Sequence, residues 1–303
     1  MAIKTGKYTV PITILSIFFG SSLILWFFTR RVFFLFDLPY IGFAVAAGIV
    51  INIASGRKSS GLGRRVTQLM VGLYFLFFLN LVIKVNMQIE GLLFQVLTGF
   101  FTGAFIHYAI AKLFGPIIFS RGFCGYACWT AMVLDFLPWK RPKGRVKGAG
   151  KFRYIHLYLS LAVVAAFLFV YKYNLKTGSM ESIYWFTAGN VIYYAAGITM
   201  AYVLKDNRAF CKYLCPVAAL MKVPARFSYF KLEAEAGKCT MCGACEKICP
   251  MDINIMKYTF QNKRILSTEC ILCSECSSVC PEKAISITKG FDIGTDGYIN
   301  YRE

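Results

Sequence analysis

The stretch RGFCGYAC, residues 121–128, returns 87 positions later as RAFCKYLC, residues 208–215. Extended to Ala131 and Ala218, the two copies are identical at six of eleven positions. The likeness continues upstream, where an arginine and a lysine stand at matching distances before the first cysteine of each copy: Arg65 and Lys84, then Arg153 and Lys172. The sequence therefore predicts a duplicated helix hairpin that closes in each copy with Arg-x-Phe-Cys-x-Tyr-x-Cys.

The chain around this repeat is strongly apolar. Hydrophobic residues make up 57% of it and charged residues only 16%, and the apolar residues occur in long runs. Runs of roughly 17 or more residues can cross a bilayer as helices. Six runs meet that length: 8–29, 38–55, 66–83, 91–119, 154–171 and 183–204. The sequence therefore predicts an α-helical membrane protein with about six transmembrane helices.

Two of these runs have unusual features. In the run 8–29, lysines precede the apolar core as in a signal peptide, but no small-residue cleavage site follows before Arg30 and Arg31. We therefore interpret it as a retained helix. The run 91–119 is longer than one span requires, and we expect Pro116 to break it near the membrane surface.

Short basic loops indicate the orientation of the chain in the membrane. GRKSSGLGRR, residues 56–65, carries four basic residues, and WKRPKGRVKGAGKFR, residues 139–153, carries seven and no acidic one. Because positive loops stay in the cytoplasm, we expect an inner-membrane protein with both termini cytoplasmic, although Arg30 and Arg31 fall on the opposite side. The net charge of +19 follows from this topology and from contact with anionic lipid, and no nucleic-acid partner is expected.

A polar tail begins near Lys205 and contains two further cysteine motifs. CTMCGACEKICP, residues 239–250, and CILCSECSSVCP, residues 270–281, both follow the pattern C-x2-C-x2-C-x3-C-P. In two-cluster ferredoxins with this pattern, the fourth cysteine of each motif ligates the other cluster. Cytoplasmic location argues against disulfides, and the duplicated spacing argues against zinc. The sequence predicts two [4Fe-4S] clusters, one held by Cys239, Cys242, Cys245 and Cys280, the other by Cys270, Cys273, Cys276 and Cys249.

The four remaining cysteines belong to the duplicated hairpins. Repeated membrane hairpins tend to pack about a pseudo-two-fold axis, with a functional site at their interface. That packing would bring together, at the cytoplasmic edge of the membrane, Cys124, Cys128, Cys211 and Cys215. We expect these thiols to bind a third iron–sulfur cluster, [4Fe-4S] or [2Fe-2S], whose negative charge Arg121 and Arg208 would offset. Local disulfides, a copper or zinc ion, and simple packing of the cysteines are the alternatives.

These patterns divide the chain into three predicted regions. Residues 1–63 hold two N-terminal transmembrane helices, and residues 64–228 hold the duplicated hairpins with their Cys-x-x-x-Cys motifs. Residues 229–303 form an α+β ferredoxin domain of the bacterial two-cluster type.

Paired Cys-x-x-x-Cys motifs at helix ends, followed by a two-cluster ferredoxin module, resemble the NapH-type membrane-bound polyferredoxins, with relatives in the C-terminal half of NosR and the CcoG proteins. The resemblance covers residues 65–290. It implies an electron conduit, because NapH and NosR are associated with quinol oxidation for respiratory reductases and CcoG with copper reduction during oxidase assembly. Two features depart from the family: Trp129 replaces the proline expected after Cys128, and the first two helices exceed the four spans of NapH, so we expect them to dock a partner subunit.

Exchange of electrons with a quinone also requires a group that takes or gives protons. His107 lies near mid-membrane in the fourth run and Lys112 lies five residues later, where an ionisable side chain is costly. We regard both as quinone or proton candidates; an interhelical hydrogen bond for His107 and a snorkelling Lys112 are the alternatives. The second repeat carries Tyr194 and Thr199 at the matching positions, and His156 is expected at the membrane interface.

The sequence therefore predicts an integral membrane electron-transfer subunit of a quinone-linked oxidoreductase complex. Electrons would pass between the membrane quinone pool and another redox subunit or a soluble carrier. The direction stays open, because hydrogen bonds and solvent exposure shift cluster potentials widely. The alternative is a metal-handling protein that reduces or binds copper at the paired cysteine motifs, since Cu(I) favours thiolate ligands.

Overall fold

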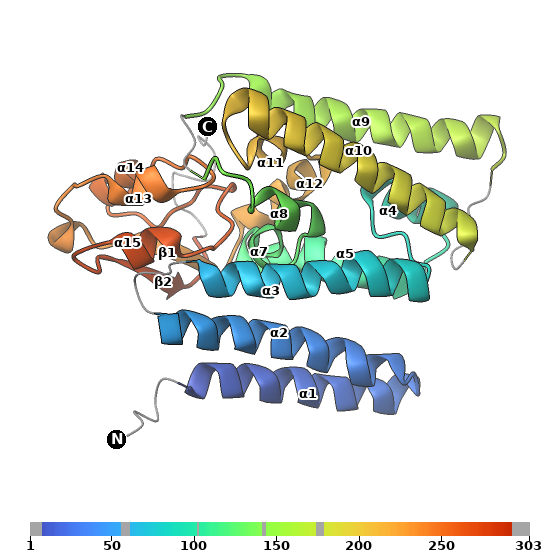
Figure 1. Cartoon of the computed structure of the whole chain (residues 1–303), viewed down its shortest axis with the longest axis horizontal. Coiled ribbons are helices and arrows are strands. Elements are labelled where there is room, and N and C mark those ends of the chain that lie inside the picture. Colours follow the sequence, from blue (N-terminus) through green and yellow to red (C-terminus); the bar gives the residue numbers. More distant parts are fainter. Residues whose placement is uncertain (1–7, 56–60, 102, 141–143, 174–178, 293–303) are drawn as a thin grey trace.

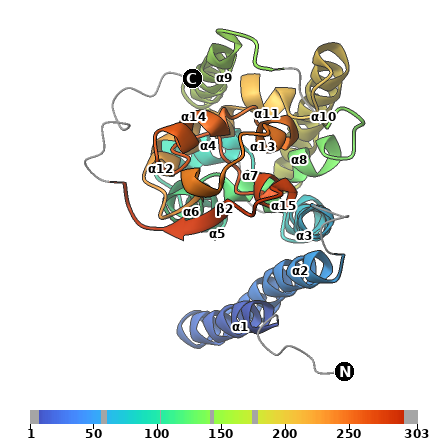
Figure 2. The same ribbon diagram turned by 90° about the vertical axis from the view of Figure 1, so that its left-hand side faces the viewer.

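The computed structural model describes residues 8–55, 61–101, 103–140, 144–173 and 179–292. The long helices lie side by side with their axes roughly aligned, and the polar tail packs at one end of them (Figure 1). Helices α1 (Thr9–Thr29) and α2 (Phe33–Ser55) form a separate layer, which meets the remainder of the bundle mainly at α3 (Leu62–Leu73) (Figure 2).

Four helices within the described ranges are long and apolar enough to cross a membrane. They are α1, α2, the continuous helix of α3 and the π-helical segment η3 (Tyr74–Val82), and the continuous helix of η5 (Ala149–Lys151), α9 (Phe152–Ala165) and η6 (Ala166–Val170). The chain is thus a multi-pass membrane protein, and four of the six expected spans correspond to helices long and apolar enough to cross a membrane. Helix α10 (Met180–Leu204) has 25 residues, but Asn190 and four tyrosines make it less apolar than those four.

The fourth apolar run is not one helix, so the prediction of a single span over 91–119 is wrong. Helix α4 (Ile89–Thr98) ends at Gly99, whose φ of 69° is a left-handed conformation that glycine adopts without strain. The chain then continues through α5 (Gly103–Ala109), the π-helical segment η4 (Ile110–Phe114) and α6 (Gly115–Phe119). Pro116 does not break the run, because it lies in the first turn of α6, where its missing N–H costs no hydrogen bond.

The two hairpins repeat each other in backbone detail. Lys84 follows η3 and Lys172 follows η6, and both lysines have left-handed φ angles, 58° and 52°. Each copy then closes with two short helices: α7 (Gly122–Tyr126) and α8 (Trp129–Leu134), then α11 (Ala209–Tyr213) and α12 (Pro216–Arg226). Cys128 and Cys215 are the N-cap residues of α8 and α12, with nearly equal dihedrals of (−70°, 119°) and (−62°, 116°). Both motifs therefore present their cysteines on the same local scaffold.

The tail is built around a two-stranded antiparallel sheet, in which β1 (Phe230–Ala234) pairs with β2 (Ile285–Lys289), Leu232 opposite Ile287. Between the strands lie η7 (Ala236–Lys238), α13 (Ala244–Ile248), α14 (Ile255–Phe260) and α15 (Glu275–Val279). The two cysteine loops repeat each other, because left-handed residues occur at equivalent places in both: Met241, Gly243 and Asp252, then Leu272, Ser274 and Lys283. These turns give the two loops the same backbone course.

Candidate functional site

The second tail motif forms one wall of a small buried cavity. Four cysteines line it: Cys249, Cys270, Cys273 and Cys276. Three come from one motif and the fourth from the other, which is the set that the crossing rule predicts for one cubane cluster. The rest of the lining is mainly apolar, with Ile253, Ile265 and Ile271 among it. Four soft thiol ligands in a dry cavity fit a [4Fe-4S] cluster.

The cysteines of the first tail motif lie nearer the surface. Cys242 is exposed, whereas Cys239, Cys245 and Cys280 are half-buried. The sulfur of Cys280 accepts a hydrogen bond from the backbone N–H of Ala284 at 3.3 Å. All twelve cysteines lie in the described ranges, and none of them forms a disulfide.

The cysteines of the duplicated motifs meet at the junction between the membrane helices and the tail. A single apolar cavity is lined by all four: Cys124, Cys128, Cys211 and Cys215. Phe123, Trp129 and Phe210 form part of the same wall. Burial and the neighbouring Cys124 and Cys211 raise the pKa of the Cys128 thiol to about 12. Thiolates form in such a place only when a cation compensates their charge.

Arg121 and Arg208 lie beside this cavity, as the sequence predicts. Arg208 donates to the Cys124 carbonyl at 3.0 Å, and its Nη1 lies 3.9 Å from the Cys211 sulfur. Arg121 is fully buried and donates through Nη1 to Glu269 at 2.5 Å, but its Nε and Nη2 have no hydrogen-bond partner within the described part of the chain. Two orphaned donors on a cation in the cavity wall fit an anionic group such as an iron–sulfur cluster.

Lys112 is a third cation at the cavity, and it lies apart from His107. Its ammonium group donates to the Met87 carbonyl at 3.1 Å and sits 3.9 Å from the centre of the Tyr108 ring and 4.8 Å from that of Trp129. Lys112 is buried, so it does not snorkel to the surface. Its ammonium group instead adds positive charge to the cysteine cavity.

His107 faces helix α2 instead of the cysteines. Its Nε2 lies 3.0 Å from a carboxylate oxygen of Asp37, which is fully buried and accepts a second hydrogen bond from the Tyr74 hydroxyl at 2.8 Å. The other ring nitrogen lies 3.2 Å from the Gly103 carbonyl. His107 therefore joins α2, η3 and α5 through an interhelical hydrogen-bond cluster.

Residues 120–126, around the first of the duplicated cysteine motifs, are hydrogen-bonded directly to the second cysteine loop of the tail. The Arg121 N–H and the Ser120 hydroxyl both donate to the Cys270 carbonyl, at 3.2 and 3.0 Å, and the Tyr126 hydroxyl donates to the Leu272 carbonyl at 3.1 Å. Cys124 belongs to the same buried core as Cys249, Cys270 and Cys276. The membrane cavity and the tail cavity are thus neighbours within one packed unit.

Buried acids hold this junction together, although no sequence motif marks them. Glu269 is fully buried among four cations: Arg121, Arg153, Arg145 and Lys222. Burial by itself would raise its pKa, but these charges outweigh that effect and hold the pKa well below its usual range. The chain has only 15 acidic residues against 34 basic ones. Glu269 directly precedes Cys270, a predicted cluster ligand, and this position could have marked it as a candidate in the sequence.

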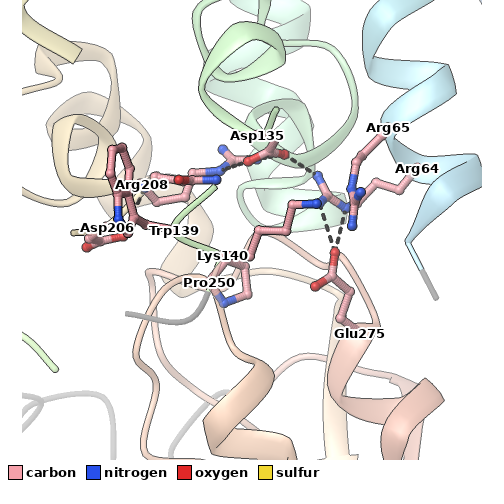
Figure 3. A pocket seen from close by; sticks show the side chains of 10 residues that line it. Arg64, Arg65, Asp135, Trp139, Lys140, Asp206, Arg208, Pro250 and Glu275 are labelled. Atoms are coloured by element: carbon pink, nitrogen blue, oxygen red, sulfur yellow. Dashed lines mark hydrogen bonds and ion pairs between the residues drawn. The ribbon is translucent and has the colours of Figure 1, made fainter. Parts of the chain in front are cut away.

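A second acidic centre links three parts of the chain. Asp135 accepts hydrogen bonds from Arg208, at 2.6 and 2.5 Å, and from Arg64 at 2.7 Å, and Arg64 also pairs with Glu275 of the tail at 2.8 Å (Figure 3). Arg64, rather than the neighbouring Arg65 that the repeat alignment matches to Arg153, therefore makes the buried contact to the tail. Both hairpins are anchored to the ferredoxin region by an arginine at the start of their first helix.

Close backbone contact at this junction leads to a first prediction. A Cβ atom added at Gly125 would lie 2.5 Å from the Ile271 carbonyl oxygen, a distance that requires the two loops to separate. We expect Gly125→Ala to destabilise the protein by roughly 1–3 kcal/mol. Gly237→Ala is the control, because nothing lies within 4 Å of the added atom. Thermal loss of iron–sulfur absorbance measures the effect, and equal midpoints for the two variants would contradict this close approach.

The geometry does not suit a single metal ion. Across the described residues, no group of three or more His, Cys, Asp or Glu side chains is arranged to hold one ion. Four sulfurs around a tetrahedral ion would lie within about 4 Å of one another. A cubane spreads its cysteine ligands more widely, since each binds a different iron.

Comparison with known proteins agrees with this arrangement. Residues 238–285 match the family described as 4Fe-4S dicluster domain. The ferredoxin-type protein MauN of Methylobacillus flagellatus, named for methylamine utilization, is 27% identical over 243 residues, 74% of this chain and 76% of that protein. The ferredoxin-type protein NapH of Haemophilus influenzae is 25% identical over 195 residues, 61% of this chain and 68% of that protein. Along most of its length the chain is therefore similar to ferredoxin-type proteins of the NapH and MauN kinds.

Another similarity covers a smaller part of the chain. An uncharacterized protein of Methanocaldococcus jannaschii is 42% identical over 69 residues, which is 20% of this chain and 28% of that protein. No solved structure matches the chain.

These similarities confirm the resemblance drawn from the cysteine motifs. The dicluster match spans all eight tail cysteines, so two [4Fe-4S] clusters are confirmed for this ferredoxin-type membrane protein, and with them a role in electron transport. Which cysteine binds which cluster, and the third cluster, stay predictions.

Proposed function

We propose that this protein is one subunit of an oxidoreductase complex in the cytoplasmic membrane. It carries electrons between a membrane quinone and a redox partner on the cytoplasmic side. The observation that carries the proposal is the cavity lined by Cys124, Cys128, Cys211 and Cys215, which is packed against the loop that begins with Cys270. An electron relay from the membrane to the tail would need a redox centre between the lipid-embedded helices and the two-cluster tail, and this cysteine site lies there.

The four cavity cysteines would hold a third iron–sulfur cluster, and the tail cysteines would hold two [4Fe-4S] clusters in the crossed sets. Bound clusters supply one-electron transfer. Three cations of the chain lie at the cavity of the four duplicated-motif cysteines: Arg121, Arg208 and Lys112. Their positive charge would lower the free-energy cost of negative charge there. Cys242 is exposed, so a soluble partner or another subunit would reach the tail at the first motif.

The orientation is supported by where the basic segments begin. Helices α3 and α9 follow the two most basic loops, and both start at the end of the bundle where the tail packs (Figure 1). Under the positive-inside rule, that end and both termini are cytoplasmic. The redox partner would then be a cytoplasmic protein or a subunit on that side. Copper handling is less well supported, since the cysteine geometry is not that of a single-ion site.

The proposal predicts that quinone and clusters exchange electrons. Anaerobically purified protein in detergent is mixed either with a short-chain quinol, or, after reduction with dithionite and removal of excess, with the corresponding quinone. We expect the iron–sulfur absorbance to bleach after quinol is added, or to recover after quinone is added to the reduced protein. If dithionite reduces the clusters but neither quinone form changes them, the quinone link is wrong.

A further inference from the structure

A second cavity, larger than the one lined by the four cysteines, lies within the membrane bundle. It measures about 250 Å³ and lies between α4, α9 and α10. Most of its wall is apolar, but Glu90, His156 and Tyr193 bring polar groups into it. An apolar cavity with a few convergent polar groups is the usual form of a small-molecule site.

Glu90 has one carboxylate oxygen satisfied and one free. Its Oε1 accepts hydrogen bonds from the Ser160 hydroxyl at 2.8 Å and from the Tyr193 hydroxyl at 3.5 Å. Its Oε2 is buried and has no hydrogen-bond partner among the residues that the structure describes. A buried, unpartnered carboxylate oxygen costs free energy unless a ligand or a proton satisfies it.

His156 is held in one orientation by the second cysteine motif. Its Nδ1 lies 2.9 Å from the Leu214 carbonyl, the residue directly before Cys215. A carbonyl only accepts hydrogen bonds, so Nδ1 carries the hydrogen and Nε2 is left as a proton acceptor. The ring lines the cavity, which differs from the simple interfacial position expected from the sequence.

Tyr193 connects this cavity to the cysteine cavity. Its side chain lines both, and its ring packs 5.3 Å from that of Phe210, the residue directly before Cys211. A molecule bound beside Glu90 is therefore separated from the four cysteines by one layer of side chains.

The cavity is also accessible from the lipid. Val163 on α9 and Ile192 on α10 line it, and both are exposed on the outer surface of the bundle, with 40% and 65% of their areas accessible. An apolar ligand dissolved in the bilayer can enter between these helices.

We propose that this cavity binds the ring of a membrane quinone, with Glu90 and His156 as its proton-exchanging partners. The inference rests on the proposed quinone link and assigns it a site. Oxidation of a quinol breaks two O–H bonds and releases two protons and two electrons. The Glu90 carboxylate takes one proton and His156 Nε2 the other, while the electrons leave past Tyr193 to the iron–sulfur centres. In the opposite direction the same two groups return the protons.

The activity test uses holoprotein with Glu90→Gln, which keeps an oxygen for Ser160 but cannot take a proton. We expect the rate of quinol-dependent bleaching, or of quinone-dependent recovery, to fall at least tenfold, with iron content unchanged. Glu235→Gln is the control, because that carboxylate is exposed on the tail and does not line the cavity. If wild type reacts with quinone and Glu90→Gln reacts equally fast, the site is wrong but the proposed function stands; if wild type does not react, both fail.

Binding can be measured without electron transfer, because Trp185 lines the cavity. A short-chain oxidised quinone should quench part of the tryptophan fluorescence in a saturable manner, and Trp185→Phe should remove that saturable part. Quenching that stays saturable in Trp185→Phe would locate the quinone elsewhere, and strictly linear quenching in wild type would indicate that the cavity holds only lipid. Either result overturns the proposed site.

Discussion

Replacing Cys124 and Cys211 together by serine should lower the iron content from about 12 atoms per chain to about 8, because one four-iron cluster is lost and two remain. If the third cluster is a [2Fe-2S], the wild-type value is about 10. One cysteine comes from each hairpin, and both line the same cavity, so the double variant removes half of the ligand set. Iron and acid-labile sulfide are measured on protein purified without oxygen, together with low-temperature EPR of the reduced sample.

The variant's tail should keep its own signals, since none of the eight tail cysteines is changed. Thr130→Val is a suitable control, because Thr130 lines the same cavity without supplying a thiol. The control should retain the wild-type iron content. A wild-type content of about 8 irons, or a double variant that keeps the full count, would rule out a third cluster. Loss of quinone reactivity in the double variant, with the tail clusters still reducible by dithionite, would identify the cavity as the entry to the tail.

Glu269→Gln should produce the largest loss of stability among the single substitutions considered. The carboxylate is fully buried and pairs with Arg121 at 2.5 Å and Arg153 at 2.8 Å, and both arginines are themselves buried. Removing one partner of a buried ion pair leaves uncompensated charge, at a cost of about 3–5 kcal/mol. The temperature at which iron–sulfur absorbance is lost should fall on the order of 10 °C.

The matched control is Glu235→Gln, whose pair with Lys238 is more than half exposed and should contribute little. The pH dependence has a definite sign. Because the pKa of Glu269 is held below its usual value, its contribution is fully present above the unfolded value of about 4.3 and is lost as pH falls through the folded pKa. The difference between wild type and Glu269→Gln should therefore be equal at pH 8 and pH 6. A difference that changes across that interval, or a control that loses as much, would contradict this account.

Cysteine spacing and long apolar runs are local signals, and both could be interpreted from the chain alone. A thiolate-bound cluster needs cysteines at fixed short separations, so the tail motifs predicted two [4Fe-4S] clusters that the dicluster match confirms. A membrane helix needs a long apolar run, and four such helices are present among the described residues. The repeat was visible for the same reason, since Cys124 and Cys211 follow their hairpins at nearly constant distance.

What the sequence by itself determined, then, was the chemistry of each segment: membrane helices, two cluster motifs and a duplicated cysteine pair. Only the tertiary structure decided which distant groups meet. The break at Gly99 folds α4 back into the bundle, which places Glu90 against α9 and α10 instead of along one long span. Glu269 gathers cations from α9, α12 and the loop before α7 because a buried carboxylate must be neutralised. Such pairings join residues that lie tens to more than a hundred positions apart, and periodicity and spacing carry no information about them.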